Sequence, residues 1–154
     1  MSASRCFSSV DDSYWPLLIN RLEGEASNQE FDAYLAQSTR FLGRGQPHVL
    51  VVDLSRVGNL PSEQRQRLAE WLRQNEEPMQ RMVLGAAYIC PSALIRLGLS
   101  IIFHLKRPPF PYLLAAREGQ AITWALSQLE AVGLREPAMR IRHELGLVSQ
   151  PRAG

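Results

Sequence analysis

The chain has 154 residues, of which 45% are hydrophobic and 21% are charged, a composition that fits one domain with a sizeable core and excludes a disordered chain. Its net charge of +2 gives little support to a nucleic-acid-binding surface, so we expect no nucleic-acid partner. Cys6 and Cys90 form no CxxC pair, which argues against a disulfide framework and against a zinc site.

Hydrophobic periodicity along the chain predicts four strands that alternate with four helices, followed by a short extra helix. In chain order the predicted elements are strand 15–22, helix 27–42, strand 48–54, helix 63–77, strand 81–90, helix 92–105, strand 112–116, helix 119–129 and helix 136–146. We expect residues 1–12 to be loose, apart from a possible short edge strand near Val10, and residues 149–154 to form a disordered tail. The alternation predicts a single α/β domain over residues 13–148, with a mixed, mostly parallel sheet of four to five strands and flanking helices.

Strand 48–54 is the expected centre of this sheet. Its run from Val49 to Val52 is continuously apolar, as in strands that are buried on both faces. A polar loop follows and leads to a helix that begins near Ser62. Functional surfaces of open α/β sheets lie outside the carboxyl ends of the strands, so this loop is the first place to look for a site.

The two helices nearest this strand carry the clearest end signals. Ser27 and Glu30 form a capping box, which predicts the start of helix 27–42. Helix 63–77 is expected to bury Leu68, Trp71 and Leu72 and to end at Pro78. The first turns of helix 63–77 are wholly polar, so we expect that end to project into solvent.

One stretch imitates a membrane span, because residues 83–105 contain only one charge, at Arg96. Pro91 and Ser92 interrupt it, so a strand followed by a buried helix is the better interpretation, and we expect no membrane span. The polar N-terminus lacks the apolar segment of a signal peptide, which favours a cytoplasmic protein.

The motifs that carry catalysis or cofactor binding are missing from the sequence. Neither GxGxxG nor GxxxxGK[ST] occurs, and no G-x-S-x-G surrounds a serine, so we expect no cofactor and no enzymatic activity. The three histidines are scattered, with His48 and His143 expected in solvent and His104 at a boundary, and we predict no metal site. Cys90 is either a buried small residue or a thiol activated at a helix start, and Asp53 either accepts N–H bonds from its loop or serves in catalysis.

Four arginines gather near the predicted carboxyl ends of the strands: Arg56, Arg65, Arg67 and Arg96. Guanidinium groups on one rim could bind an acidic or phosphorylated partner. The alternative is a solvated rim in which Glu63 and Glu70 pair with nearby arginines.

Helix 92–105 is apolar on most of its sides, and such a helix must be buried by something. Either it is a core helix between the sheet and its neighbours, or one side is exposed as a partner surface or lines an apolar ligand pocket. In a domain of this size we expect part of the helix to reach the surface, with a homodimer through it as one possibility.

Residues 49–62 resemble the STAS domain, the fold of the SpoIIAA anti-sigma factor antagonists. In that family a strand ends in Asp-Leu-Ser, as from Asp53 to Ser55 here, and an Asp-Ser pair opens the next helix. The serine of that pair is the family's phosphorylation site. Its place falls on Ser62, while Pro61 stands where the family has Asp.

The resemblance is closer to the SpoIIAA-like (STAS-like) bacterial proteins, which are also compared with the lipid-binding CRAL-TRIO fold, and it covers roughly residues 15–132. Further positions with counterparts in these proteins are Gly85, Ala86, Ala87, Tyr88, Pro91, Ser92, Arg96, Ala121 and Trp124. The resemblance implies a STAS-like α/β fold with the order of elements given above.

The resemblance and the missing catalytic motifs predict a non-enzymatic regulatory module that binds an unidentified protein through the loop and helix start after strand 48–54. The residues expected to contact the partner are Asp53, Ser55, Arg56, Asn59, Arg65 and Arg96. Ser62 is a possible phosphorylation switch, because free N–H groups at a helix start favour a phosphate, which adds about −2 charge. The alternative function is a carrier of a small apolar or lipid ligand under helix 92–105.

Overall fold

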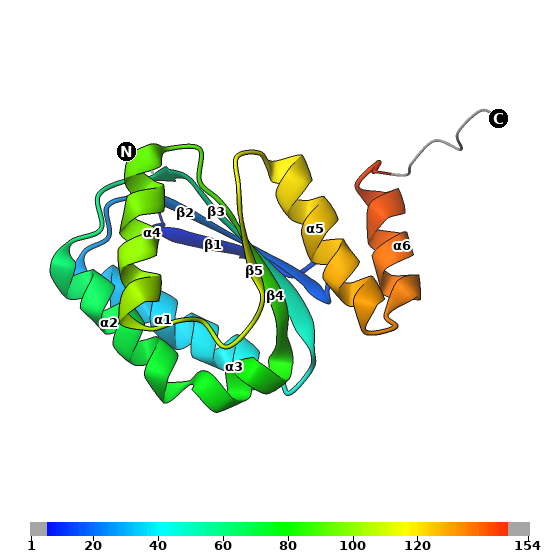
Figure 1. Cartoon of the computed structure of the whole chain (residues 1–154), viewed down its shortest axis with the longest axis horizontal. Coiled ribbons are helices and arrows are strands. Elements are labelled where there is room, and N and C mark those ends of the chain that lie inside the picture. Colours follow the sequence, from blue (N-terminus) through cyan, green and yellow to red (C-terminus); the bar gives the residue numbers. More distant parts are fainter. Residues whose placement is uncertain (1–5, 148–154) are drawn as a thin grey trace.

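One five-stranded sheet runs through the molecule, as the computed structural model of residues 6–147 shows (Figure 1). The strands have the same order in the sheet as in the chain: β1 (Ser8–Asp11), β2 (Leu17–Gly24), β3 (His48–Val57), β4 (Val83–Ile89) and β5 (Tyr112–Ala115). β1 is antiparallel to β2, and the other three pairings are parallel. The predicted α/β fold with a mixed, mostly parallel sheet is confirmed.

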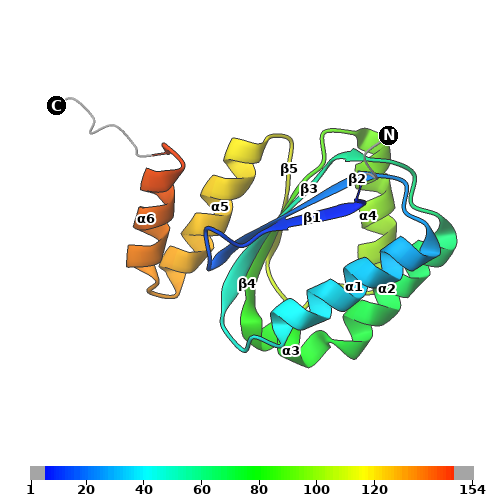
Figure 2. The same cartoon turned by 180° about the vertical axis from the view of Figure 1, so that it is seen from behind.

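The helices divide between the two faces of the sheet (Figures 1 and 2). One face is covered by α1 (Asn28–Leu42), α2 (Ser62–Gln74), α3 (Glu76–Met82) and α4 (Ala93–Leu105), and the other by α5 (Glu118–Ala131) with α6 (Arg135–Glu144) packed against it. Crossovers between parallel strands of one sheet are right-handed. When successive crossovers all proceed in the same direction across the sheet, their helices therefore lie on the same face.

β3 is the middle strand, as its apolar run predicts. Val49 and Val51 are fully buried in the core under α5, and Val52 and Leu54 are buried in the core under α1, α2 and α4. Burial on both faces explains why this strand lacks the alternation of apolar and polar residues that a half-exposed strand shows.

The capping box at the start of α1 is confirmed. The Ser27 hydroxyl accepts from the Glu30 N–H at 3.1 Å, and the Glu30 carboxylate accepts from the Ser27 N–H at 3.0 Å. Two N–H groups that the first turn leaves without intrahelical partners are thereby satisfied.

The single helix predicted over residues 63–77 is wrong in its extent. The chain forms α2 and α3, and Pro78 lies in the first turn of α3 instead of ending a helix. A proline is tolerated there because the N–H groups of the first turn have no carbonyl partner within the helix. Residues 81 and 82 complete α3, so β4 begins at Val83, two residues later than predicted.

The prediction that the polar start of α2 projects wholly into solvent is wrong. Gln64 is buried, and its side-chain amide donates to the Ala26 carbonyl at 2.8 Å and to the Asn28 side chain at 3.3 Å. The amide satisfies backbone that leads into α1, and a polar residue can therefore point inward at this end of the helix.

His48 is also placed differently from the prediction of a solvated side chain. Only 1% of its surface is exposed, its ring stacks on Trp15, and its Nδ1–H donates to the Gln46 carbonyl at 2.8 Å. His143 is exposed, as predicted.

The chain before Trp15 contributes to the sheet, because residues 8–11 form β1, the short edge strand expected near Val10, and are not loose. Phe7, just before β1, is buried in the core under α1. The tail predicted for residues 149–154 lies outside the described residues.

Candidate functional site

A groove of about 420 Å³ opens at the carboxyl ends of the parallel strands, between the loop that follows β3 and helix α4. Gly58, Asn59 and Leu60 line it on the loop side, and Leu94 and Leu97 line it on the helix side. The β3 to α2 connection that the sequence singled out therefore forms one wall of a groove.

The helical wall of this groove is strongly apolar and open to solvent. Leu94 is 70% exposed, Leu97 58% and Ile101 41%. These residues follow one another at i, i+3 and i+7 on one side of α4, whereas Leu99 and Ile102, on the adjacent side, are buried. Part of helix 92–105 therefore reaches the surface, as expected. The sequence indicates this exposed apolar side because the helix is apolar on most of its sides.

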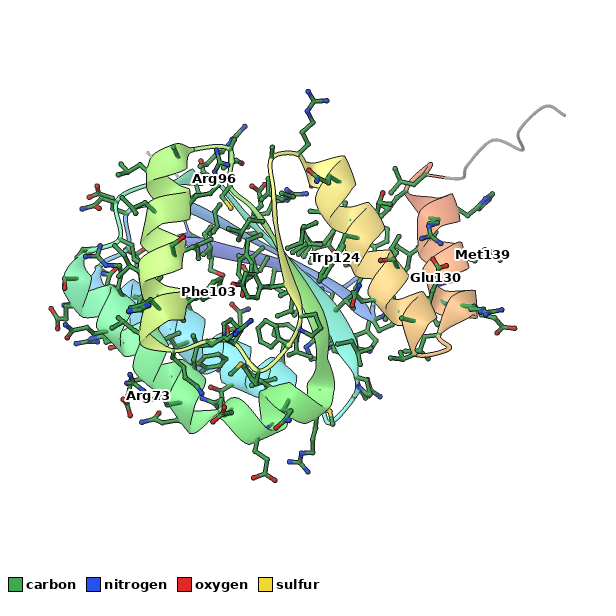
Figure 3. The ribbon with its side chains drawn as sticks, in the orientation of Figure 1. Arg73, Arg96, Phe103, Trp124, Glu130 and Met139 are labelled. Carbon is green, nitrogen blue, oxygen red and sulfur yellow. The ribbon has the colours of Figure 1, made fainter. Side chains whose placement is uncertain are left out.

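A second cavity, of about 100 Å³, lies beside the groove, between the sheet and helices α1, α2 and α4. The residues that line both the groove and the cavity are Tyr34, Val52, Leu68, Tyr88 and Leu99. Phe103 lines the cavity from α4 and contacts Tyr88 at a ring-centroid distance of 5.5 Å, on the side of the helix that faces the sheet (Figure 3).

Two tyrosines lie at the junction of groove and cavity. Burial raises the pKa of Tyr88, and burial also raises that of Tyr34, although a hydrogen bond with Ser38 opposes the shift. Both phenols therefore stay neutral over the physiological range and place polar atoms in a mainly apolar interior. The sequence alone does not identify them, because they come from α1 and β4.

The six predicted contact residues do not form one cluster. Ser55, Asn59 and Arg65 line the groove, whereas Asp53 belongs to the opposite face of the sheet. Arg56 is exposed at the end of β3, in register with Glu23 of β2.

Asp53 has a structural role in the end of β3. Its carboxylate accepts from the Ser55 N–H at 2.9 Å and the Ser55 hydroxyl at 2.6 Å, and it pairs with Arg21 at 2.7 Å. Arg21 also pairs with Glu118 in the first turn of α5. Burial alone would raise the pKa of Asp53, but the Ser55 hydrogen bonds and Arg21 outweigh it and hold that pKa below its usual value. The prediction that Asp53 accepts N–H bonds from its loop is confirmed.

The arginines of the rim differ in their surroundings. Arg65 donates to the Leu60 carbonyl at 2.6 Å, which holds its guanidinium at the mouth of the groove. Arg67 pairs with Asp32 and Glu63, and Arg73 pairs with Glu70. The alternative prediction, in which Glu63 and Glu70 pair with nearby arginines of a solvated rim, is thus confirmed for these two carboxylates.

Arg96 is exposed near the start of α4 (Figure 3), close enough to Cys90 for its positive charge to affect the pKa of that thiol. Burial raises the pKa of the Cys90 thiol, and the charge of Arg96 opposes this without reversing it. The Cys90 thiol donates to the Tyr88 carbonyl at 3.4 Å, so a buried residue, and not an activated thiolate, is what the structure supports.

Ser62 is the first residue of α2, directly after Pro61 at the N-cap position, and it is exposed. Pro61 provides no side-chain cap for the helix. The first turn of α2 therefore has N–H groups that no N-cap side chain satisfies, and the Ser62 hydroxyl is accessible at that turn. Phosphorylation of Ser62 stays a prediction.

Within residues 6–147, no group of three or more His, Cys, Asp or Glu side chains could hold a metal ion. Over the same part of the chain, no helix has both the length and the apolar character needed to cross a membrane.

No protein-family model matches the chain, and no curated protein matches it. Solved structures do share its fold. An uncharacterized protein of the DUF3478 family with a SpoIIAA-like fold, from Shewanella loihica PV-4, has a TM-score of 0.58 over 81% of this chain and 98% of its own, at 13% identity. An anti-sigma factor antagonist from Mycobacterium paratuberculosis has a TM-score of 0.52 over 81% and 98%, at 21% identity.

SiaC from Pseudomonas aeruginosa is similar as well. Its apo form has a TM-score of 0.51 over 75% of this chain and 96% of its own, at 16% identity. A complex of the diguanylate cyclase SiaD with its activator SiaC gives 0.50 over 76% and 98%, also at 16% identity. The chain therefore has the SpoIIAA-like, or STAS-like, fold that its sequence resembles.

Proposed function

We propose that this SpoIIAA-like domain is a non-enzymatic regulatory module that binds a partner protein beside the groove. The contact surface consists of the loop after β3, the start of α2 and the exposed side of α4. The observation that carries this proposal is the row of exposed apolar side chains Leu94, Leu97 and Ile101, next to a polar loop. An apolar patch rimmed by polar groups is typical of a protein-binding surface.

The solved structures with this fold support the same kind of role. One is an anti-sigma factor antagonist, and another is SiaC, the activator of SiaD, seen in a complex with that enzyme. Each is named for its effect on another protein.

The test is affinity isolation from the protein's own cell with the wild type and a Leu97→Asp variant. Leu97 is largely exposed, so the substitution leaves the core intact while placing a charge in the apolar row. Met139→Asp is the matched control, because Met139 is likewise largely exposed, at 70%, but lies on α6, across the sheet (Figure 3). We expect Leu97→Asp to lose a partner that the wild type and Met139→Asp retain. Identical partners for all three would contradict the proposed surface.

Ser62 provides a second test of the same surface. A phosphate on this residue would sit at the start of α2 and add negative charge beside Arg65, which changes the partner that the surface accepts. We expect Ser62→Asp and Ser62→Ala to capture the partner to different extents, while Ser127→Asp, at an exposed position of α5, behaves like the wild type. Equal capture by both Ser62 variants would remove this residue from the mechanism.

A homodimer through α4 stays a prediction that the same variants can test. Sedimentation equilibrium of the wild type should show dimers that Leu97→Asp dissociates and Met139→Asp does not. A monomeric wild type would exclude α4 as a self-association surface and leave the heterologous partner.

A second candidate function is the carriage of a small apolar ligand under α4. The mainly apolar lining of the groove and of the cavity beside it favours this function. Native mass spectrometry of the purified protein should then show an adduct that denaturation releases. A clean apoprotein mass after purification from its own cell would count against this function.

A further inference from the structure

The part of the chain that contains α4 carries basic side chains but no acidic ones. Between Glu77 and Glu118 the sequence has no Asp or Glu, yet it holds four arginines and one lysine. The same stretch supplies five of the seven large hydrophobic side chains that are exposed within residues 6–147: Leu94, Leu97, Ile101, Leu105 and Tyr112. A surface that is both apolar and cationic is complementary to a partner surface that is apolar and anionic.

Three arginines around the exposed row of α4 have no acidic partner within the described part of the chain. Arg96 lies in the first turn of α4 (Figure 3), Arg107 follows two residues after the end of that helix, and Arg65 lines the groove from α2. Arg67 and Arg73, also on α2, each pair with a carboxylate. The three unpaired guanidinium groups are therefore available to carboxylates of a partner, whose geometry they match.

The form of the partner follows from the form of α4. Within a helix the backbone N–H and C=O groups pair with one another, so α4 offers an incoming segment only side chains and cannot accept an added strand. Its exposed row, from Leu94 to Leu105, extends over about 16 Å. A partner helix of three turns presents an apolar stripe of the same length, and it can pack along α4 in the groove beside the β3 to α2 loop.

An anionic membrane matches this surface less closely than a helix does. Juxtamembrane and interfacial segments that bind anionic lipids carry clusters of about four to eight Lys or Arg, whereas α4 itself contains one arginine. Arg65 also lies across the groove from α4, where a narrow segment can reach it more readily than the flat face of a bilayer.

We propose that the partner presents an acidic amphipathic helix to α4, with its apolar stripe on the exposed row and its carboxylates beside Arg65, Arg96 and Arg107. This inference rests on the proposed protein-binding function and names the chemistry of the partner. Because Arg96 and Arg107 lie at the two ends of the row, acidic residues are expected near both ends of the partner's stripe.

The experiment uses two labelled synthetic peptides that differ only in charge. Both are about four turns long and carry leucine at i, i+3, i+7 and i+11, with either glutamate or lysine at the flanking positions. Fluorescence anisotropy measures the affinity of each peptide for the full chain. We expect the glutamate peptide to bind at least about tenfold more tightly than the lysine peptide at low ionic strength, and less than about threefold more tightly in 0.5 M salt, where the charges are screened.

Charge reversal on the protein distinguishes local charge from net charge. A double variant, Arg96→Glu with Arg107→Glu, changes two exposed side chains and should weaken the glutamate peptide at least about tenfold while strengthening the lysine peptide. A single Arg96→Glu variant should give a smaller effect of the same sign. Arg135→Glu is its matched control, because Arg135 is exposed and has no acidic partner in the described part of the chain but lies on α6, across the sheet. Leu97→Asp should weaken both peptides, since both use the apolar row.

The outcomes separate the chemistry of the partner from the function on which it rests. Equal affinities for the two peptides, both lost in Leu97→Asp, would overturn the acidic helix and leave the protein-binding surface. Absence of binding by both peptides, while Leu97→Asp still loses a partner from the cell, would do the same. An equal effect of Arg96→Glu and Arg135→Glu would show that only net charge matters and would overturn the assigned arginines.

Two further results would contradict the inference at a different level. Vesicles of phosphatidylglycerol and phosphatidylcholine that retain the wild type but not Leu97→Asp, without binding of the glutamate peptide, would assign α4 to a membrane. Identical cellular partners for the wild type and Leu97→Asp would overturn the proposed function itself, and the acidic helix with it.

Discussion

His48 begins β3 with its ring stacked on Trp15 at a centroid distance of 4.9 Å. Burial lowers the pKa of His48 below its ordinary value of 6.5, the charge of Arg44 adds to the effect, and the hydrogen bond to Gln46 opposes it. The imidazole is therefore neutral in the folded protein, with the proton on Nδ1 that the Gln46 carbonyl accepts.

This histidine makes stability depend on pH. As the pH falls below about 6.5, the unfolded chain binds a proton that the folded chain resists, so the contribution of His48 is complete above that pH and is lost below it. Urea unfolding from about pH 8 down to about pH 5 should show a steeper loss of stability for the wild type than for His48→Phe. His143→Gln, at an exposed position, should follow the wild type. Parallel curves for the wild type and His48→Phe would contradict the assignment.

Asp53 should contribute to the free energy of unfolding through its hydrogen bonds with Ser55 and its ion pair with Arg21. Asp53→Ala removes the acceptor of two Ser55 bonds and the partner of Arg21, and we expect a loss of about 1–3 kcal/mol in the free energy of unfolding. Asp32→Ala is the control, because Asp32 also pairs with an arginine but is more exposed, and its loss should stay under about 1 kcal/mol. Equal losses would show that Asp53 acts as an ordinary surface charge.

At the scale of elements, two glycines of neighbouring elements should respond in opposite directions to the same substitution. Gly98 lies inside α4 with free space around it, so Gly98→Ala should stabilise the protein by about 0.5–1 kcal/mol through helix propensity. Gly85 lies in β4 under α5, where a Cβ would be 3.0 Å from Gln128 Cγ and 3.1 Å from the Trp124 ring.

Gly85→Ala should therefore destabilise the protein by about 1–3 kcal/mol, because the Trp124 ring packs directly over this position. Thermal unfolding of both variants beside the wild type is the measurement. A stabilising effect at both positions would show that the packing of α5 on β4 adapts more easily than the contacts indicate.

The elements also show where sequence patterns suffice. The Ser27 and Glu30 signal depends on neighbours three residues apart, and it predicted the start of α1 correctly. The sequence pattern predicts a helix end at Pro78 because a proline breaks a helix interior, but a new helix begins at Glu76 and places Pro78 in its first turn. No local pattern distinguishes a proline that ends one helix from a proline that lies at the start of the next.

At the scale of the whole molecule, the sheet is covered closely on its α5 face because the contacting residues are small. Ala121 and Ala125 of α5 and Ala87 of β4 are fully buried there. Ala125→Leu should cost about 1–3 kcal/mol, since the added atoms have no space between helix and sheet. Ala131→Leu, at an exposed position of the same helix, should change stability by less than about 0.5 kcal/mol. Chemical denaturation compares the two, and equal effects would contradict close packing.

The sequence by itself determined the alternation of strands and helices along the chain and the central place of β3, because these depend on hydrophobic period and on signals between near neighbours. Its resemblance to the STAS-like proteins indicated the fold. It also located the loop after β3. Only the tertiary structure decided which side chains that loop meets. Asp53 and Arg65 are twelve residues apart in the sequence, yet the alternating sides of a strand direct Asp53 toward α5 and the following turn brings Arg65 to the groove under α4. The groove and its cavity exist only where α1, α2, α4 and the sheet meet, and no segment of the sequence contains that information.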